Sequence, residues 1–587
     1  MGRTRGKWWA RLLVLTATLA PLAQPDVAGA APVAGASAPQ AISTCATTPG
    51  WNPSNAEPIS AIDGSYVYVA WIGCWSSLSG IAVATSSDGG RTFAAPVLIP
   101  APVPLNLTRG MDQWDPALAV GPNHDVYLAY MSGDICAITH DCGANPTPIS
   151  VYVASSTDHG RTFSAGTALE QASGSTPTFA DRPFIAVAPD GTIAVSYDFS
   201  PNASLDQLLC SPTGSCSYGL GDYNAVVQVS SDGGATWSPQ IPIDPNYPFG
   251  GEWSAAIVAQ PNSTFDVFMW DHVTDPTTYA LSSGPMTFSH SSPDGLSWST
   301  PRVVSSADVP LTTWWIDGSI GIDAAGTLYV AWDAQAAGGD VPYLAYSMND
   351  GATWSAPIAL GAPLASLSHL VSVVGGSPGV GYLEMQTGDA AGYQVQVAAF
   401  SPMLGLLAPW QSISPTSYDP TVWPGDTVGL SYGGLSAGSA SLETAWGGAL
   451  PTTGSTNPSE IWTSTVALAL PVPARPRGLT VGASGTTLTA TWLTSPGATS
   501  YTCTLEYGFA APSSFSVTTT SAHCAFAGAA GTMPLGVAVV ANGLGGASSV
   551  AEAFAPPARW VCVRGRSVRV PRPGQNSCPH GFHRRAR

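Results

Sequence analysis

Short apolar runs separated by polar turns fill residues 45–470, and this pattern predicts β-strands. Residues 116–130 and 183–197 each hold two runs rich in β-branched and aromatic side chains around a polar turn, and residues 320–332 repeat the arrangement. Such runs, bounded by Gly, Asn and Asp, are typical of antiparallel hairpins. We expect each hairpin to supply the first two strands of a four-stranded sheet, with first strands beginning near Pro58, Pro116, Pro183, Trp253, Ile316, Leu370 and Asp426.

One short pattern, Ser-x-Asp-x-Gly-x-Thr-aromatic, recurs five times among these hairpins. Successive Asp positions are 70, 74, 62 and 55 residues apart, with Asn in the last copy (158−88, 232−158, 294−232, 349−294). Repeats of this length predict a radial array of similar sheets. The copies occupy residues 86–93, 156–163, 230–237, 292–298 (one residue shorter) and 347–354.

Each copy of the pattern predicts a tight hairpin turn. The short carboxylate accepts hydrogen bonds from the backbone of its own turn, and Gly takes the positive φ that such turns need. We therefore interpret the repeated acidic position as structural rather than catalytic. It is held by Asp88, Asp158, Asp232, Asp294 and Asn349.

The repeated pattern resembles the Asp box of sialidases and related β-propellers. The resemblance implies an all-β fold, an Asp-box β-propeller over residues 45–470. The hairpins favour seven blades, and six is the alternative because sialidase catalytic domains have six. In these families the boxes lie on the face away from the active site, which would also remove the box residues Arg91 and Arg161 from it.

The pattern changes after residue 470. Pro471, Pro473 and Pro476 predict a stiff linker. The runs 488–492, 501–505 and 537–542 then resemble the strands of a fibronectin type III β-sandwich, with Trp492 as its core tryptophan. We expect this domain over residues 471–557, followed by a basic, Cys-bracketed tail over 558–587.

The first residues predict secretion. Arg3, Arg5, Lys7 and Arg11 precede an apolar run and a small-residue site at residues 28–30, which is the pattern of a signal peptide over 1–30. An Ala/Pro-rich linker is expected over 31–44. We expect a secreted protein, extracellular or associated with the cell wall, with no membrane span, and a monomer.

Secretion makes the ten cysteines candidates for disulfides. Proximity in the sequence favours five pairs, although sequence alone does not fix connectivity. The pairs are Cys45–Cys74, Cys136–Cys142, Cys210–Cys216, Cys503–Cys524 and Cys562–Cys578. No His/Cys cluster has the spacing of zinc ligands, so we expect no metal site and no cofactor, with a structural calcium ion left open.

Charge is sparse and uneven. Residues 45–556 hold 36 acidic residues (37 less Asp26) and seven basic ones (19 less four near the N-terminus and eight in the tail). Such an acidic surface repels polyanions and argues against nucleic acid as a partner. The tail holds eight arginines and no acid, which fits either contact with an anionic cell-wall polymer or a solvated basic end.

Candidate chemistry gathers at the starts of the first strands and the ends of the second. Carboxylates hydrogen-bond to sugar hydroxyls or serve as acid and base, and tryptophan faces stack on sugar rings. The alternative is that these acids tie neighbouring loops or hold an ion or water. The catalytic candidates are Asp115, Asp181, Glu252 and Asp271, and the binding candidates are Arg182, Arg109, Trp114, Trp253, Trp314, Trp315, Asp317 and Trp423.

The sialidase resemblance does not extend to the catalytic set. That family clamps the substrate carboxylate with three arginines, and outside the boxes and Arg302 only Arg109 and Arg182 remain in the propeller. The preferred function is recognition of carbohydrate or a glycoconjugate, either by a binding protein or by a glycoside hydrolase. The alternatives are an exo-α-sialidase with an unusual clamp and a non-catalytic interaction scaffold at the cell surface.

Overall fold

The computed structural model is all-β, and none of its described residues lies in a helix. The described part of the chain accordingly holds no helix long and apolar enough to cross a membrane. The described residues are 33–43, 56–75, 78–100, 102, 112–133, 149–169, 179–200, 208–210, 216–218, 224–244, 252–271, 273–274, 281–282, 284–305, 319–336, 339–361, 370–389, 392–414, 434–448, 460–468, 473–484, 487–495, 497–507, 516–526, 535–543, 546–554, 560–564, 567–569, 580 and 583–586.

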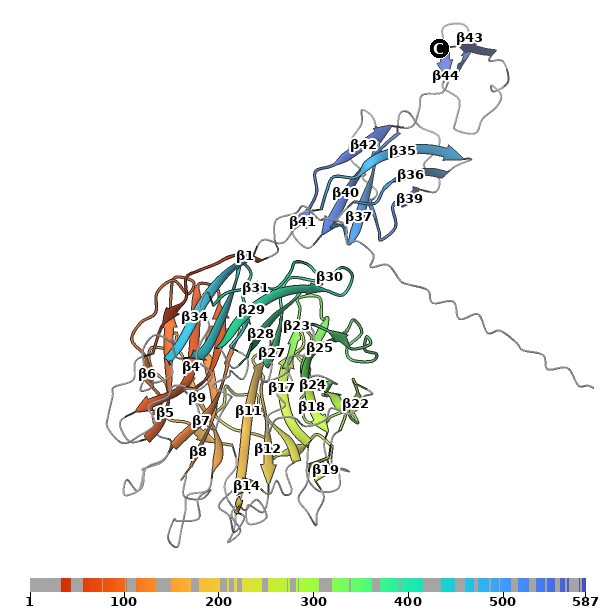
Figure 1. The fold of residues 1–587 in the computed structure, drawn as a ribbon. Helices are drawn as coiled ribbons and strands as arrows, with labels where there is room; N and C mark the ends of the chain where they lie inside the picture. Colours follow the sequence, from red (N-terminus) through yellow and green to blue (C-terminus); the bar gives the residue numbers. More distant parts are fainter. Residues whose placement is uncertain are drawn as a thin grey trace, which may run out of the picture.

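Seven antiparallel sheets of four or five strands make up the described part of residues 33–468 (Figure 1). In the first five sheets the strands follow one another in sequence order, whereas the last two strands of the sixth both pair with its third strand and N-terminal strands join the seventh. The first sheet contains β3 (Ala56–Asp63), β4 (Tyr66–Trp75), β5 (Leu78–Ser86) and β6 (Val97–Leu98). The second contains β7 (Asp112–Val120), β8 (Val126–Gly133), β9 (Ser150–Ser156) and β10 (Thr167–Ala168). The third contains β11 (Phe179–Val187), β12 (Ile193–Ser200), β15 (Asn224–Ser230) and β16 (Ile241–Pro242).

The next three sheets repeat this arrangement, with a fifth strand in the sixth. The fourth contains β17 (Glu252–Ala259), β18 (Phe265–Asp271), β21 (Met286–His290) and β22 (Arg302–Val303). The fifth contains β23 (Ser319–Ile322), β24 (Leu328–Ala336), β25 (Gly339–Ser347) and β26 (Ile358–Ala359). The sixth contains β27 (Leu370–Gly375), β28 (Gly381–Asp389), β29 (Gly392–Ser401), β30 (Gly405–Leu406) and β31 (Gln411–Ser412). Small hairpins, β13 (Leu208–Cys210) with β14 (Cys216–Tyr218) and β19 (Val273–Thr274) with β20 (Leu281–Ser282), extend from the third and fourth sheets.

The seventh sheet joins the two ends of this region. It contains β32 (Ser436–Ala437), β33 (Ser441–Gly448) and β34 (Glu460–Leu468), with β1 (Val33–Ala36) and β2 (Gln40–Ala41) paired to β34. The linker expected over residues 31–44 is therefore wrong for 33–36 and 40–41, because these residues supply the outer strands of the last sheet. Because this sheet contains strands from both ends of the region 33–468, its hydrogen bonds close the ring of sheets.

The first strands of the seven sheets surround one cavity. Each of β3, β7, β11, β17, β23, β27 and β32 contacts the next, and β32 contacts β3. The cavity has a volume of about 330 Å³ and is lined by residues from all seven strands, mostly Ala, Val and Ile with a few Ser. Sheets arranged face to face around a central channel are the arrangement of a β-propeller.

Aromatic side chains on the second strands fill the space between neighbouring sheets. Trp71, Trp270, Trp332 and Trp446 each have at most 2% of their surface exposed, and Tyr130 and Tyr197 have none. Burying apolar surface stabilises the fold by roughly 25 cal/mol per Å². Each of these large aromatic side chains therefore contributes several kcal/mol. Nearly every residue of these strands is buried, as in β8, because successive side chains point to opposite faces and a neighbouring sheet covers each face.

The repeated turns have the hydrogen bonds of a closed carboxylate-capped hairpin. The Oδ1 atom of Asp88 accepts from Thr92 N at 2.9 Å, and its Oδ2 atom accepts from Thr92 Oγ1 at 2.7 Å. Asp158 and Asp232 bind Thr162 and Thr236 in the same way. These hydrogen bonds lower the pKa of each of the three aspartates to about 2. In the shorter fourth copy, Asp294 accepts from Leu296 N instead, at 3.1 Å.

A second body of two sheets follows the propeller. One sheet contains β35 (Arg477–Ser484), β36 (Thr487–Leu493) and β39 (His523–Phe526). The other contains β38 (Ser516–Thr519), β37 (Ser500–Tyr507), β40 (Leu535–Gly543), β41 (Gly546–Ala547) and β42 (Ala551–Phe554). Trp492 is 6% exposed and packs against Tyr501, with ring centroids 5.1 Å apart. A small sheet of β43 (Trp560–Arg564), β44 (Ser567–Arg569) and β45 (His583–Ala586) lies beyond it.

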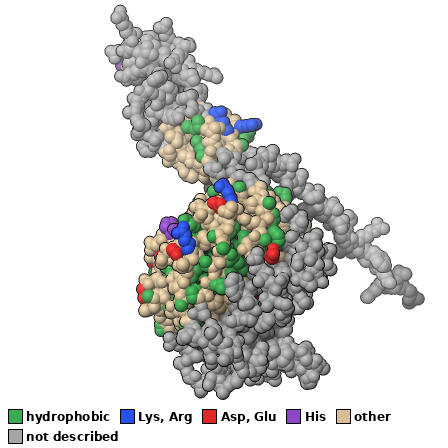
Figure 2. Space-filling view, turned by 90° about the vertical axis from the view of Figure 1, so that its left-hand side faces the viewer, with side chains coloured by type: hydrophobic (Ala, Val, Ile, Leu, Met, Phe, Trp, Pro, Cys, Tyr) green, Lys and Arg blue, Asp and Glu red, His purple; other side chains and the backbone are tan. Residues whose placement is uncertain are grey.

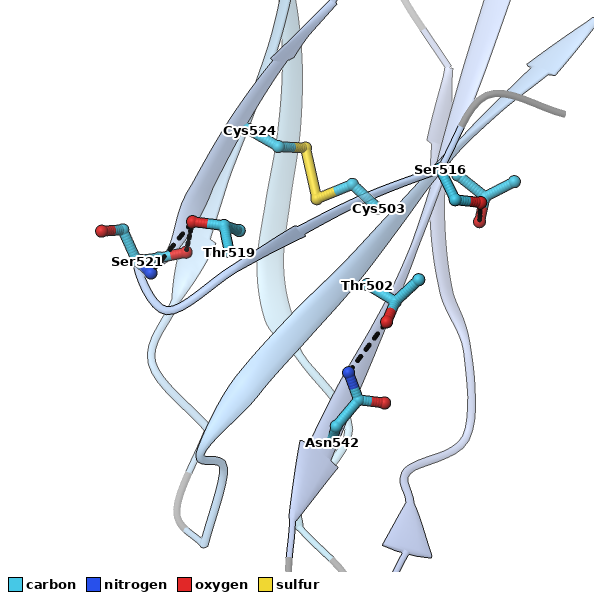
Figure 3. The surroundings of a disulfide bond; sticks show 8 residues. Thr502, Cys503, Ser516, Thr519, Ser521, Cys524 and Asn542 are labelled. Carbon is cyan, nitrogen blue, oxygen red and sulfur yellow. Dashed lines mark hydrogen bonds between the residues drawn. A yellow bond between two sulfur atoms is a disulfide. The ribbon is translucent and has the colours of Figure 1, made fainter. Parts of the chain in front are cut away.

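A disulfide joins the two sheets of this sandwich. Cys503 on β37 is bonded to Cys524 on β39, as the spacing predicts (Figure 3). Both residues belong to the hydrophobic core of the sandwich. Cys210 and Cys216 are opposite each other in the register of β13 and β14. The side chains of the other predicted pairs lie outside the described residues.

Candidate functional site

Three neighbouring first strands begin with the same irregularity. Glu57, Asp115 and Arg182 each precede a proline and have φ values of 52°, 50° and 50°. The strand register shifts at each of these positions, which marks a β-bulge. A left-handed conformation costs a residue other than glycine about 1–2 kcal/mol, and a following proline restricts it further. Strain of this kind is concentrated at functional sites.

The bulges bring the side chains of β3, β7 and β11 together, because each bulge turns one side chain away from the regular alternation. The carboxyl group of Asp115 forms side-chain hydrogen bonds with both Glu57 and Asp181, and the charge of Arg182 acts on Asp115 and Asp181. A hydrogen bond between two carboxyl groups requires a proton on one of them. We call Glu57, Asp115, Asp181 and Arg182 the inner-strand cluster.

Burial and like charge change the acidity of this cluster. Burial, followed by the charge of Glu57, raises the pKa of Asp115 well above its usual range. Burial, followed by the charge of Asp115, raises the pKa of Asp181 to about 7. The positive charge of Arg182 opposes both shifts. The cluster therefore holds at least one proton at neutral pH and can exchange one near pH 7.

The side chains at the inner-strand cluster differ in how far they are exposed to solvent. Arg182 is 2% and Asp115 9% exposed, whereas Asp181 and Trp114 are partly exposed. The central cavity begins close by, because the lining residues Ile59, Ala117 and Phe184 each follow a member of the cluster by two positions. Asp181 and Glu57 are thus the partly exposed carboxyl groups of this cluster, whereas Asp115 and Arg182 are buried.

This arrangement can perform two kinds of chemistry. A partly exposed carboxyl group with a pKa near 7 can give a proton to a leaving group or take one from water. The same groups can donate and accept hydrogen bonds to vicinal hydroxyls, and the indole of Trp114 offers an apolar face. Among the described residues, no group of three or more His, Cys, Asp or Glu has the geometry of a metal site.

The box turns lie at the other end of the sheets from this cluster. In the third sheet, Asp181 is opposite Asp198, which is opposite Ala225. At the far end of the same strands, Val187 is opposite Ile193, which is opposite the box residue Ser230. The strand length separates the two ends, so the box carboxylates take no part in the cluster.

The structure brings some of the predicted site residues together, and others lie outside its described residues. Asp115, Asp181 and Arg182 come together, and Trp114 precedes Asp115 on β7. Glu252 and Asp271 are opposite each other in the register of β17 and β18, and Trp253 is opposite Trp270, but the side chains of Glu252, Asp271 and Trp253 are not described. The remaining candidates lie outside the described residues: Arg109, Trp314, Trp315, Asp317 and Trp423.

Two acidic residues at this site were not among the predicted candidates: Glu57, a member of the cluster, and Asp198, which lies opposite Asp181. Glu57 precedes Pro58 as Asp115 precedes Pro116 and Arg182 precedes Pro183, so the acidic or basic residue before a strand-initiating proline was the available signal. Asp198 is 2% exposed and lies opposite Asp181. Its signal was the aromatic–Asp pair at the end of the second strand, which recurs as Trp270-Asp271 and Trp332-Asp333.

Charged side chains are otherwise few on the described surface. The face of the molecule in Figure 2 shows isolated basic and acidic side chains among polar and apolar ones. This agrees with a content of only 10% Asp, Glu, Lys and Arg in the whole chain. Against this background, four charged groups meeting at one point are an exception that calls for an explanation.

No family of known proteins matches the sequence, and no curated protein matches it. Among solved structures, a Hadza microbial sialidase is 14% identical over 56% of this chain and 63% of its own, with a TM-score of 0.40. An α-L-arabinanase of Penicillium chrysogenum, solved with arabinobiose, is 14% identical over 62% and 98%, with a TM-score of 0.41. The NanB sialidase of Streptococcus pneumoniae is 12% identical over 73% and 70%, with a TM-score of 0.38. Similarities this low establish neither a family nor an activity.

Proposed function

We propose that this chain is a secreted β-propeller protein that binds carbohydrate at the inner-strand cluster and uses Asp181 as the proton donor in glycosidic-bond hydrolysis. The observation that carries this is Asp181 itself: a partly exposed carboxyl group whose pKa is raised to about 7, hydrogen-bonded to a second carboxyl group. General acids work best when their pKa lies near the working pH. Asp115 and Arg182 would hold Asp181 in place from behind.

The architecture that goes with this function has several parts. We infer that the seven sheets are seven blades, supported by the ring of contacts among their first strands. We infer that the sandwich is a fibronectin type III domain, supported by its three- and five-stranded sheets and by Trp492 in its core. The signal-peptide pattern of residues 1–30 supports secretion, and the basic tail suits an anionic cell-wall polymer.

A carbohydrate ligand suits this site for chemical reasons. Sugar rings offer apolar faces for tryptophan and many hydroxyls for carboxyl groups. A pair of carboxyl groups with different surroundings is the usual equipment for glycoside hydrolysis. Within the described residues, one arginine contributes to the cluster, which favours neutral or weakly charged sugars over a ligand clamped by several guanidinium groups.

The test begins with a glycan array probed by the full chain, followed by hydrolysis of the glycans it binds. In the Asp181→Asn variant, we expect hydrolysis to fall by about 10²–10⁴-fold while binding stays within a few-fold, because the amide keeps its hydrogen bonds but holds no acidic proton. Asp190→Asn is the matched control. Asp190 is exposed, binds only its own turn at Thr192 N and lies at the other end of the same sheet.

The pH profile gives an independent check. Because the protonated form of Asp181 would act, turnover should be retained below about pH 7 and should fall about tenfold per pH unit above it. Binding without turnover would leave a carbohydrate-binding propeller and remove the catalytic role. Unchanged binding and turnover in Asp181→Asn, or sialoside hydrolysis that survives Arg182→Ala, would contradict the assigned site.

A further inference from the structure

A second buried carboxyl group lies where the ring of sheets closes. Here the N-terminal segment meets the last sheet and the turn of the first box. Ser37 N donates to Thr465 O at 2.8 Å, and Thr465 N donates to Ser37 Oγ at 3.0 Å. Gln40 Nε2 donates to the carbonyl of Gly90 at 2.6 Å. We call this meeting point of residues 33–41, β33, β34 and residues 86–93 the closure seam.

Glu443 on β33 is at the centre of the closure seam. Its surface is 0% exposed. Its Oε2 atom lies 2.7 Å from Thr465 Oγ1, and Thr465 Oγ1 lies 3.3 Å from the carbonyl oxygen of Gly89 in the box turn. Its Oε1 atom has no described partner of good hydrogen-bond geometry, and Thr463, which lies two positions before Thr465 on β34, lowers the pKa of Glu443 as Thr465 does. The turn packs directly on the carboxyl group, because a Cβ atom on Gly90 would lie 2.6 Å from Oε2.

The donors and acceptors around Glu443 indicate whether its carboxyl group is protonated. The hydroxyl of Thr465 has one proton, and the Gly89 carbonyl can only accept. Both contacts of Thr465 Oγ1 are therefore satisfied at once only if Glu443 carries a proton and donates it to Thr465, which then donates to Gly89. An ionised Glu443 would take the proton of Thr465 and leave Gly89 without it, and would bury a negative charge with only the hydroxyls of Thr463 and Thr465 beside it.

Within the described part of the chain, no charged side chain lies close enough to Glu443 to compensate its ionisation. Its neighbours across the sheet are Ser436 on β32 and Thr465 on β34, and the box turn offers glycines. Within that turn, Asp88 is bound to Ser86 and Thr92, and Arg91 is exposed. Burial raises the pKa of Glu443 to about 8.

We propose that Glu443 is a proton-operated latch: in its protonated form it ties the first box turn and the N-terminal strands to the last sheet, and loss of the proton loosens the closure seam. The ring is then held most tightly in acid. Opening the seam would expose Glu443 to water and return it to an ordinary carboxylate, so proton release and seam opening are linked.

The sign and the window of this linkage follow from the two states. With the pKa of Glu443 raised from 4.5 to about 8 in the closed seam, the closed form binds a proton that the open form has lost. The stabilisation is complete below about pH 4.5, falls as pH rises through this window, and has gone above about pH 8. One proton corresponds to about a tenfold change in the opening equilibrium per pH unit.

Hydrogen–deuterium exchange of the full chain between pH 5 and pH 9 tests the latch. The amides to follow are those of residues 33–43 and 460–468, with observed rates corrected for intrinsic chemical exchange. We expect protection of these amides to fall about tenfold per pH unit up to about pH 8 and then to level off. In Glu443→Gln the profile should be flat, because the amide nitrogen still donates to Thr465 but does not titrate.

Glu384→Gln is the matched control. Glu384 on β28 is 1% exposed and burial raises its pKa to about 8, but it accepts a hydrogen bond from Gln386 and belongs to the sixth sheet rather than to the closure seam. The seam amides of this variant should keep the wild-type slope. Should Glu443→Gln fail to fold, Thr465→Ser must keep the slope and Thr465→Val must lose seam protection at pH 5. A flat wild-type profile, a slope that survives Glu443→Gln, or full protection in Thr465→Val would each overturn the latch.

Discussion

At the scale of single residues, buried polar side chains stabilise the turns between first and second strands. Asp323 is 2% exposed and accepts hydrogen bonds from Ala325 N, Thr327 N and Tyr329 OH at 2.8–3.0 Å. It also accepts from Gly379 N of the next sheet at 2.7 Å. The carboxylate of Asp323 thus closes its own turn and links the fifth sheet to the sixth. Because four donors bind it, this acid can be buried without a basic side chain among its hydrogen-bond partners.

Replacing this carboxylate is the first prediction at the residue scale. Asp323→Ala should lower the free energy of unfolding by about 3–5 kcal/mol, because buried donors of two sheets lose their acceptor. Asp190→Ala is the control, since Asp190 occupies an exposed turn and binds only Thr192 N, and it should cost at most about 1 kcal/mol. Denaturant unfolding of both variants measures the difference. Equal costs would show that the buried hydrogen bonds of Asp323 add nothing to stability beyond those of an exposed turn.

At the scale of elements, each box turn packs against the sheet before it. Gly351 of the fifth box lies on the ring of Phe288 in the fourth sheet, and Gly160 of the second box lies on Tyr68 and Thr85 in the first. These glycines have φ values of 70° and 73°, so the left-handed turn and the close packing both exclude a side chain. The repeated turn geometry therefore also provides the contact between neighbouring sheets.

Gly351→Ala separates the packing of the turn from its backbone conformation. Its new Cβ would overlap the Phe288 ring, which is 1% exposed and has no space to move into. Gly89→Ala is the matched control, because Gly89 has a φ of 75° and nothing within 4 Å of an added Cβ. Both should lose about 1–2 kcal/mol to the left-handed backbone, and Gly351→Ala about 1–3 kcal/mol more. Thermal unfolding compares them, and similar losses would contradict the packing role.

At the scale of the whole molecule, the ring depends on strands from opposite ends of a long segment. Residues 33–41 pair with β34 more than 400 positions later, as in Ser37 with Thr465 at a separation of 428. Pairing of this kind covers the edge of β34, which would otherwise be exposed, and exposed edges promote association. The propeller should therefore unfold as one cooperative unit.

Removing residues 33–41 tests closure. We expect a lower melting temperature of the propeller transition and concentration-dependent association, because β34 becomes an edge strand. An equally long deletion of residues 579–587 should leave that transition unchanged. Differential scanning calorimetry and light scattering measure the two effects. An unaltered transition after removal of 33–41 would show that the N-terminal strands do not close the ring.

The sequence by itself determined the strands, the repeated turns and one disulfide, because each depends on neighbours within a few tens of residues. The Asp–Gly–Thr spacing fixes a turn locally, and Cys503 and Cys524 are 21 positions apart. The tertiary structure decided what distant segments do together: residues 33–41, which look like a linker, become strands of the last sheet, and Glu57 joins Asp115 and Asp181. Such contacts leave no local pattern, because a strand edge or a carboxyl group acquires its partner only when the ring closes.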